Sequence, residues 1–158
     1  MPFTTYDSPL GQLTLVADSD GTLRHLYFPG TAPDLDDADH DPGALAAAVQ
    51  QLDQYFHGER TTFDLELETA GTPFQRSVWD LLRGIPYGQT TTYGELARAL
   101  EAQPRAVGSA VGATPIPIIV PCHRVIGSDG SLTGYGGGLP RKRALLDLES
   151  GVLPLAPV

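Results

Sequence analysis

The sequence predicts an α+β protein with two modules: a small amino-terminal three-stranded sheet with one helix, then a mostly helical carboxy-terminal region. Three observations predict this division. Segments typical of strands fill the first thirty residues, helix-start signals dominate from residue 72 onward, and the net charge differs between the two regions. A chain of 158 residues is long enough for one ordinary domain or two small ones. We place the boundary at Gly71, between modules of residues 1–70 and 71–158.

The strands are predicted from residue type and turn chemistry. The segments TTYDSPLGQLTLVAD and GTLRHLYF are rich in β-branched and aromatic residues, and Gly11 and the Asp20–Gly21 pair mark turns. Further along, TTFDLELE (residues 61–68) alternates apolar and polar residues. This period of two predicts a half-buried strand there.

The first two helices are predicted from their start and stop signals. After an acidic, proline-bearing loop, Asp41 and Pro42 form an N-cap and first helical position, and Gly58 ends that helix. The segment Thr72–Gln75 has the composition of a capping box with proline at the first position, and it opens a helix that Gly84 ends.

A helix-turn-helix is predicted in the middle of the second module. Thr92–Glu95 is a second capping-box sequence and opens the short helix ELARAL. A turn at residues 101–104 leads to RAVGSAVGA (residues 105–113), whose small side chains allow close approach to another surface. This arrangement is typical of DNA-binding proteins, although many helical hairpins bind nothing.

The remaining chain is predicted to hold a cysteine in a fixed position. Residues 116–121 are apolar and interrupted by prolines, which predicts a short, buried, extended segment that ends at Cys122. A hairpin turn at residues 128–131 and a flexible glycine loop at residues 134–140 follow. The last helix starts near Pro140 and stops at Gly151.

Composition excludes several classes of protein. The 41% hydrophobic and 18% charged content is that of a globular protein, and no apolar run or leader segment predicts a membrane span or export. A single cysteine forms no internal disulfide, which favours the cytoplasm. The formal charge of −9 is uneven: residues 1–70 hold 13 acids and two bases, whereas residues 71–158 hold six acids and eight bases. A polyanion is therefore expected to bind the second module, and no apolar stripe predicts an oligomer, so we expect a monomer.

Cys122 is a candidate nucleophile because of its neighbours. The thiolate is the reactive form of cysteine, and the adjacent His123 and Arg124 supply a base and a positive charge that favour it. The alternative is a buried cysteine that serves only as a small hydrophobic residue. No metal site is expected, because adjacent Cys-His spacing is wrong for one and a second cysteine is absent from the sequence.

The run Pro121-Cys122-His123-Arg124-Val125-Ile126 resembles the active-site motif of the 6-O-alkylguanine-DNA alkyltransferases, also called methylated-DNA–protein-cysteine methyltransferases. The resemblance extends to GTPFQRSVWDLLRGIPYGQTTTYGELA, Arg105-Ala106-Val107-Gly108, GYGGGL and Leu148-Glu149, and it is strong over residues 71–150. It implies a ribonuclease-H-like first module, a winged-helix-like second module and the repair of alkylated guanine in double-stranded DNA without a cofactor.

The same resemblance implies a role for each matching residue. Cys122 accepts the alkyl group permanently, His123 removes the thiol proton through a water molecule, and Glu149 orients His123. Tyr93 hydrogen-bonds the base that is flipped out of the duplex, and Arg105 fills the gap that the base leaves. The other residues implied in binding DNA or the flipped base are Ala106, Gly108, Thr114, Val125, Tyr135 and Gly136. Taken singly, these are also ordinary core, surface or turn residues.

Two departures and two rival functions accompany the resemblance. Thr114 stands where the family commonly has asparagine, and the turn before Arg105 is shorter by about two residues than usual. Some members hold zinc in the amino-terminal half, and none is expected here. One rival is an alkyltransferase-like lesion binder, which lacks the reactive cysteine. The other is a cysteine hydrolase, which usually draws its histidine from far along the chain. Activity on 4-O-alkylthymine and the range of alkyl groups remain open.

Overall fold

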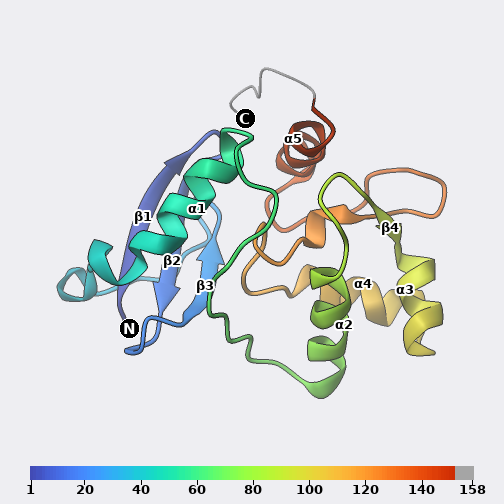
Figure 1. Ribbon diagram of the computed structural model, residues 1–158. Helices are drawn as coiled ribbons and strands as arrows, with labels where there is room; N and C mark the ends of the chain where they lie inside the picture. The colour runs from blue at the N-terminus through green and yellow to red at the C-terminus, as the bar shows by residue number, and fades with distance from the viewer. Residues whose placement is uncertain (152–158) are drawn as a thin grey trace.

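Three antiparallel strands in the order β1-β2-β3 form the predicted amino-terminal sheet (Figure 1). The structure is a computed structural model that describes residues 1–151. β1 (Phe3–Ser8) pairs with β2 (Gly11–Ala17), and β2 pairs with β3 (Leu23–Tyr27). The tight turn between the first two strands has Gly11 at a φ of 103°, in the region that glycine adopts without strain. The predicted sheet is therefore confirmed.

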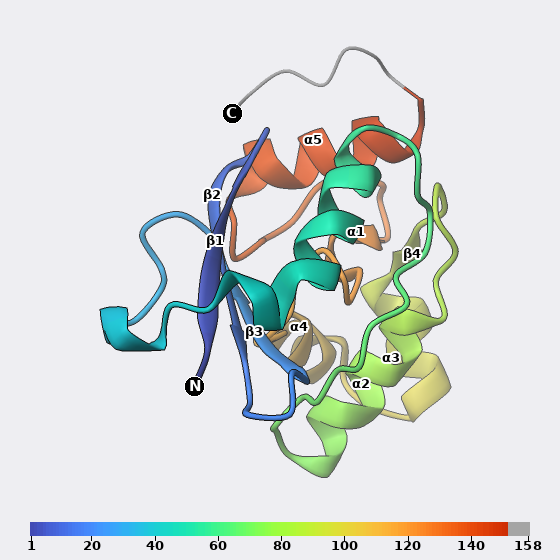
Figure 2. The ribbon, with the colours of Figure 1, turned by 60° about the vertical axis from the view of Figure 1, so that its left-hand side comes forward.

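Helix α1 (Ala46–Phe56) covers one face of this sheet (Figures 1 and 2). Asp41 accepts a hydrogen bond from the backbone N–H of Ala44, as its predicted capping role requires, but the first turn, Pro42–Leu45, is a 3-10 helix. α1 ends at Phe56, two residues before Gly58, whose φ is 73°. The last turn of α1 buries Tyr55 completely.

The strand predicted at residues 61–68 is wrong. Only Leu67 forms a bridge, with Leu23 of β3. The backbone of Asp64 is bound instead by the side chain of Gln51 on α1, which accepts from the Asp64 N–H at 2.8 Å and donates to its carbonyl at 2.9 Å. A side-chain amide thus satisfies the backbone of Asp64 in place of a neighbouring strand.

The second region is mostly helical, as predicted. Its elements are α2 (Pro73–Arg83), β4 (Thr91–Thr92), α3 (Tyr93–Leu100), α4 (Pro104–Gly112), β5 (Val125–Ile126) and α5 (Leu139–Glu149). The two short strands β4 and β5 pair in parallel. The capping box at Thr72 is complete, with hydrogen bonds in both directions between Thr72 and Gln75.

Helices α3 and α4 form the predicted helix-turn-helix (Figure 1). Thr92 caps α3 by accepting from the Glu95 N–H, but the Glu95 carboxylate accepts from Thr91 instead of completing the predicted box. Glu101 ends α3 in the left-handed conformation with a φ of 52°. The indole N–H of Trp79 on α2 donates to a carbonyl of α4 at 2.9 Å and holds the pair against the core.

The segment before the cysteine is buried as predicted, but the extended conformation is wrong. The Val120 N–H donates to the Ile116 carbonyl, and Ile118 has a φ of 73°, so the chain makes a tight turn. A β-branched residue in the left-handed region costs about 1–3 kcal/mol. The turn allows Ile116, Ile118, Ile119 and Val120 all to be buried, which an extended strand with alternating side chains would not do.

The two regions share one hydrophobic core. Backbone and side-chain hydrogen bonds cross between them: the Leu26 N–H of β3 donates to the Pro115 carbonyl, and Arg141 of α5 donates to the Leu10 carbonyl at 2.8 Å. Helix α5 also lies beside the carboxy-terminal end of α1 in both views (Figures 1 and 2). The position of α5 is therefore fixed partly by the first sixty residues.

The capping box supports a prediction on stability. Thr72→Ala removes the side-chain acceptor of the Gln75 N–H and should lower the free energy of unfolding by about 1 kcal/mol. Urea denaturation followed by circular dichroism measures the loss. Thr61→Ala, at an exposed position outside any helix, is the control. An equal effect of both substitutions would contradict the role of the box.

Candidate active site

Cys122 begins a single 3-10 turn, Cys122–Arg124, that directly precedes β5. Its N–H donates to the Val120 carbonyl at 2.7 Å, which links the cysteine to the strained turn before it. The residue is 4% exposed, and all three residues of the 3-10 turn are buried. The thiol is thus held by rigid backbone on both sides.

The positive charge next to Cys122 in the sequence does not lower the pKa of its thiol below the ordinary value. Burial raises the pKa of Cys122 to about 11, and the nearby Thr114 and Tyr135 hydroxyls and the Lys142 ammonium only oppose that rise. The neighbouring Arg124 charge is engaged elsewhere, in an ion pair with Glu149. At neutral pH the thiol is protonated, so a base must remove its proton as it reacts.

Glu149, at the end of α5, is the centre of a buried hydrogen-bond network. Its Oε2 accepts from His123 Nε2 at 2.7 Å and from the Tyr55 hydroxyl at 2.6 Å. Arg124 binds the carboxylate in bidentate fashion, from Nε at 2.7 Å to Oε1 and from Nη2 at 2.9 Å to Oε2. Burial alone raises the pKa of Glu149, but the hydrogen bonds from His123, Arg124 and Tyr55 outweigh it and hold the pKa at about 2.

This network fixes the protonation of His123. Because Glu149 is ionised, the His123 Nε2 carries the proton that it donates, and Nδ1 is left with a lone pair. Among residues 1–151, no protein group donates to this buried Nδ1. Burial lowers the pKa of His123 more than Glu149 raises it, so the ring is neutral near pH 7. His123 therefore has the state that a general base requires.

A cavity of about 170 Å³ opens beside Cys122, and Thr114, Tyr135 and Gly136 line it together with Phe28 of the sheet region. The Thr114 hydroxyl donates to the Val111 carbonyl at the end of α4. Gly137 is required here because a side chain would meet the Phe28 ring at about 2.9 Å. The amino-terminal sheet thus closes one side of the cavity around the thiol.

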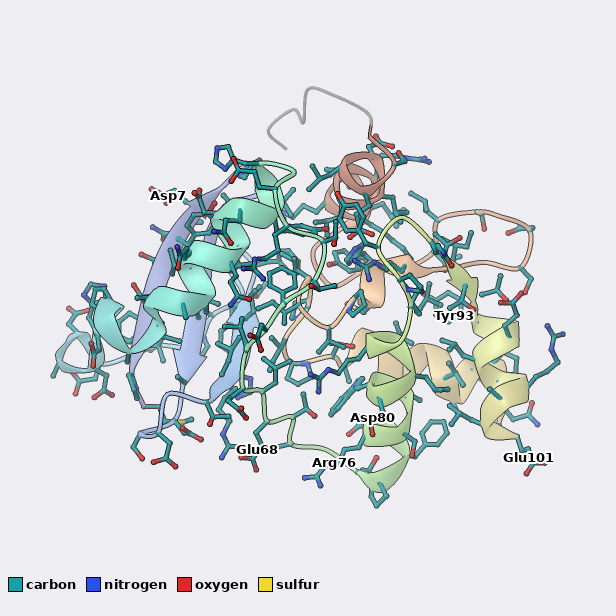
Figure 3. All side chains as sticks on the ribbon, viewed as in Figure 1. Asp7, Glu68, Arg76, Asp80, Tyr93 and Glu101 are labelled. Atoms are coloured by element: carbon teal, nitrogen blue, oxygen red, sulfur yellow. The ribbon has the colours of Figure 1, made fainter. Side chains whose placement is uncertain are left out.

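A wider hollow of about 570 Å³ shares Tyr135 and Gly136 with that cavity and is otherwise lined by Tyr93, Arg105 and Gly108, among others. Tyr93 starts α3, and Figure 3 shows it on the helix-turn-helix side of the molecule. Its ring packs near Gly108 of α4, where a side chain would lie 3.8 Å from it. Arg105 is exposed at the start of α4.

Two of the residues predicted to bind DNA or the flipped base lie outside both hollows. Ala106 is exposed on α4, and the Val125 side chain is completely buried in β5. Sequence reasoning also missed three residues: Arg124 as a partner of Glu149, Tyr55, and Lys142. Lys142 is fully buried, donates to the Thr133 carbonyl at 2.8 Å and lies 5.9 Å from the centre of the Tyr93 ring. A buried lysine on a helix of mixed polarity leaves no signal in the sequence.

Within residues 1–151, no group of three or more His, Cys, Asp or Glu side chains could hold a metal ion. In the same part of the chain, no helix is long and apolar enough to cross a bilayer.

The fold and site define a class of protein: a helix-turn-helix protein with one buried cysteine beside a neutral histidine and a buried carboxylate. Family models agree. One described as 6-O-methylguanine DNA methyltransferase, DNA binding domain, matches residues 73–151, and one described as its ribonuclease-like domain matches residues 1–69. The chain belongs to the 6-O-methylguanine DNA methyltransferase family.

Relatives and solved structures resemble the chain over nearly its whole length. A methylated-DNA–protein-cysteine methyltransferase of Mycobacterium bovis is 51% identical over 96% of this chain and 94% of its own. An inducible one from Bacillus subtilis is 44% identical over 90% of this chain and 81% of its own. The crystal structure of Mycobacterium tuberculosis OGT in complex with DNA superposes with a TM-score of 0.90, at 51% identity, over 98% of this chain and 96% of that one. The predicted family and fold class are therefore confirmed.

The raised pKa of Cys122 predicts its reactivity toward a small reagent. Alkylation of the folded protein by iodoacetamide should be slow at pH 7 and should still be accelerating above pH 9, because the pKa lies near 11. Mass spectrometry of the alkylated protein gives the rate. The denatured chain, whose thiol has an ordinary pKa, is the control. A rate that levels off below pH 8 would show a thiolate at neutral pH and contradict this assignment.

The lowered pKa of Glu149 predicts acid sensitivity. A carboxylate with a folded pKa of about 2, against an ordinary 4.5, contributes about 3 kcal/mol above pH 4.5, and that contribution is lost as the pH falls toward 2. Glu149→Gln leaves Arg124 buried without a counter-ion and should cost about 3–5 kcal/mol at pH 7. The variant should also lose this part of the acid dependence. Chemical denaturation at several pH values measures both effects, and Asp147→Asn on the same helix is the control.

Proposed function

We propose that Cys122 is the acceptor in the repair of alkylated guanine in DNA. The family repairs DNA by direct reversal, with transfer of an alkyl group to a protein cysteine, and this chain contains a single cysteine. The observation that carries the proposal is the neutral His123, which follows Cys122 in the same buried turn. The ionised Glu149 holds His123 by a hydrogen bond. This arrangement supplies nucleophile, base and orienting carboxylate.

The transfer balances without a cofactor. The Cys122 sulfur attacks the alkyl carbon, a carbon–sulfur bond forms, and the bond from that carbon to the guanine 6-oxygen breaks. The thiol proton passes to His123 Nδ1 through a water molecule, and Glu149 stabilises the resulting imidazolium. The proton held by the imidazolium then passes through water to the departing base, which is hydrogen-bonded by the Tyr93 hydroxyl, so the base leaves as neutral guanine and His123 is neutral again. The thioether is stable, so each protein molecule reacts once.

The DNA-binding residues are assigned from their positions around the two hollows. The target base must leave the duplex to reach Cys122, and the damaged base costs less to unstack than a normal one. Arg105, exposed at the start of α4, fills the vacated place in the stack. Ala106 and Gly108 let α4 approach the minor groove closely.

The remaining assignments concern the pocket for the flipped base. The Val125 carbonyl and the Gly136 N–H contact the base edges, and Tyr135 walls the pocket that it lines with Gly136. Thr114 joins α4 to the active-site turn, because its hydroxyl donates to the Val111 carbonyl of α4 and also lies beside the Cys122 thiol.

The two halves of the chain are assigned different roles. Residues 1–70 form a supporting module, and residues 71–158 form the module that binds DNA and carries the reaction. We assign the protein to the cytoplasm, where a free thiol stays reduced, and to a monomeric state.

Intact-protein mass spectrometry tests the function. After incubation with duplex DNA that carries one 6-O-methylguanine, the protein should gain one methyl group, mapped to Cys122 and absent from Cys122→Ala. Methyl loss from DNA in excess of the protein would indicate a hydrolase that turns over. Tight binding to the lesion without any gain of mass would indicate a lesion-recognition protein and would overturn the proposal.

A further inference from the structure

Resting on the proposed function, we propose that Tyr55, from the amino-terminal half, is a positioning residue for the transfer, because it shares Oε2 of Glu149 with His123 and so keeps His123 neutral and ready to accept a proton. The supporting module then contributes directly to the reaction. Its contribution is a single hydroxyl, 94 residues away from Glu149 in the sequence.

The contact is short and enclosed. The Tyr55 hydroxyl donates to Glu149 Oε2 at 2.6 Å, and His123 Nε2 donates to the same oxygen at 2.7 Å. Tyr55 is 0% exposed, and the Glu149 side chain is 1% exposed. In such surroundings water cannot replace a lost donor at little cost, so the bond affects the charge on the oxygen strongly.

The tyrosine ring is held by aromatic neighbours on several sides. Phe56 and Tyr87 meet it edge-on at centroid distances of 5.2 and 6.1 Å, and Phe63 lies tilted at 5.4 Å. These neighbours come from α1, the segment that follows it, and the loop after α2. These contacts restrict the Tyr55 side chain to one rotamer, in which the hydroxyl points at Glu149.

The effect on His123 follows from the sharing of one oxygen. A donor on Oε2 withdraws negative charge from it, and a less negative carboxylate stabilises an imidazolium less. Tyr55 thereby helps to keep the pKa of His123 below its ordinary value, although burial is the largest cause. The other charged or titratable groups that face the pair are Arg124, Lys142, Tyr87, Tyr135 and Cys122. Arg124 also donates to Glu149, whereas Lys142 donates to the Thr133 carbonyl and Tyr87 to the Leu148 carbonyl.

Tyr55→Phe removes only the hydroxyl and keeps the ring. The protein as it stands is mixed with a 6-O-methylguanine duplex, and the second-order rate of methylation is measured from pH 5.5 to 9. The rate should fall on the acid side where His123 becomes protonated, and the variant should move that limb up by about one pH unit. The rate at pH 8.5 should change by less than about threefold.

The matched control is Tyr6→Phe. Tyr6 donates to Asp53, also on α1, at 3.0 Å and stacks on Phe56, so this variant loses a phenol–carboxylate bond that does not touch Glu149. Its acid limb should coincide with that of the unmodified protein. A Tyr55→Phe profile that is lowered equally at every pH, or left unchanged, would reduce Tyr55 to a structural role and overturn the proposal.

Two further measurements test the role of Tyr55 if Tyr55→Phe does not fold or if the protein transfers no methyl group. With 3,5-difluorotyrosine at position 55, the more acidic phenol is a stronger donor and should move the acid limb to lower pH; a shift to higher pH contradicts the proposal. The pKa of His123, read by NMR of histidine-labelled protein, should rise in Tyr55→Phe whether or not methyl transfer occurs. If the unmodified protein transfers no methyl group, the proposed function fails, and an unchanged His123 pKa in the variant is what overturns the role of Tyr55.

Discussion

The structure depends on one constraint, the burial of the ionised Glu149 carboxylate between the two halves of the chain. An isolated carboxylate is too costly to bury, so the fold must bring donors to it. Tyr55 arrives from α1, and His123 and Arg124 arrive from the turn that holds Cys122. Arg124 also donates to the Ile85 carbonyl, which anchors the loop between α2 and β4. The packing of four segments is thus set by the hydrogen-bonding needs of one side chain.

The same constraint separates the charges that the reaction uses. Burial keeps Cys122 protonated and His123 neutral, and Arg124, paired with Glu149, leaves little positive charge for the thiol. A buried, protonated thiol is a weak nucleophile, because the thiolate is the form that reacts. We therefore expect the resting protein to resist oxidation and unwanted alkylation. Lowering the pKa of the thiol permanently would remove that protection.

Local signals predicted the fold well, and non-local contacts explain what was missed. The caps at Asp41 and Thr72 and the turn glycines depend on neighbours within four residues, so the sequence reveals them. The strand predicted at residues 61–68 is interrupted at Asp64, where the side chain of Gln51, on another element, satisfies the backbone. The motif around Cys122 identified the family, yet no pattern in the sequence could place Tyr55 on Glu149 or reveal the buried Lys142. Such contacts exist only after the two halves have packed.

The uneven charge of the chain means that the two halves differ in their electrostatic interaction with DNA. Residues 1–70 hold 13 acids and two bases, and Asp7 and Glu68 show how these acids lie on the surface of that half (Figure 3). We therefore expect the acids to repel a duplex from the sheet side, and we expect the duplex to bind the surface that carries Arg105 and the hollow beside it. The second half has only two more bases than acids, so few phosphates are neutralised and a short contact suffices. The amino-terminal half closes one side of the cavity at the thiol through Phe28, and we expect its acids to direct the DNA to the other half.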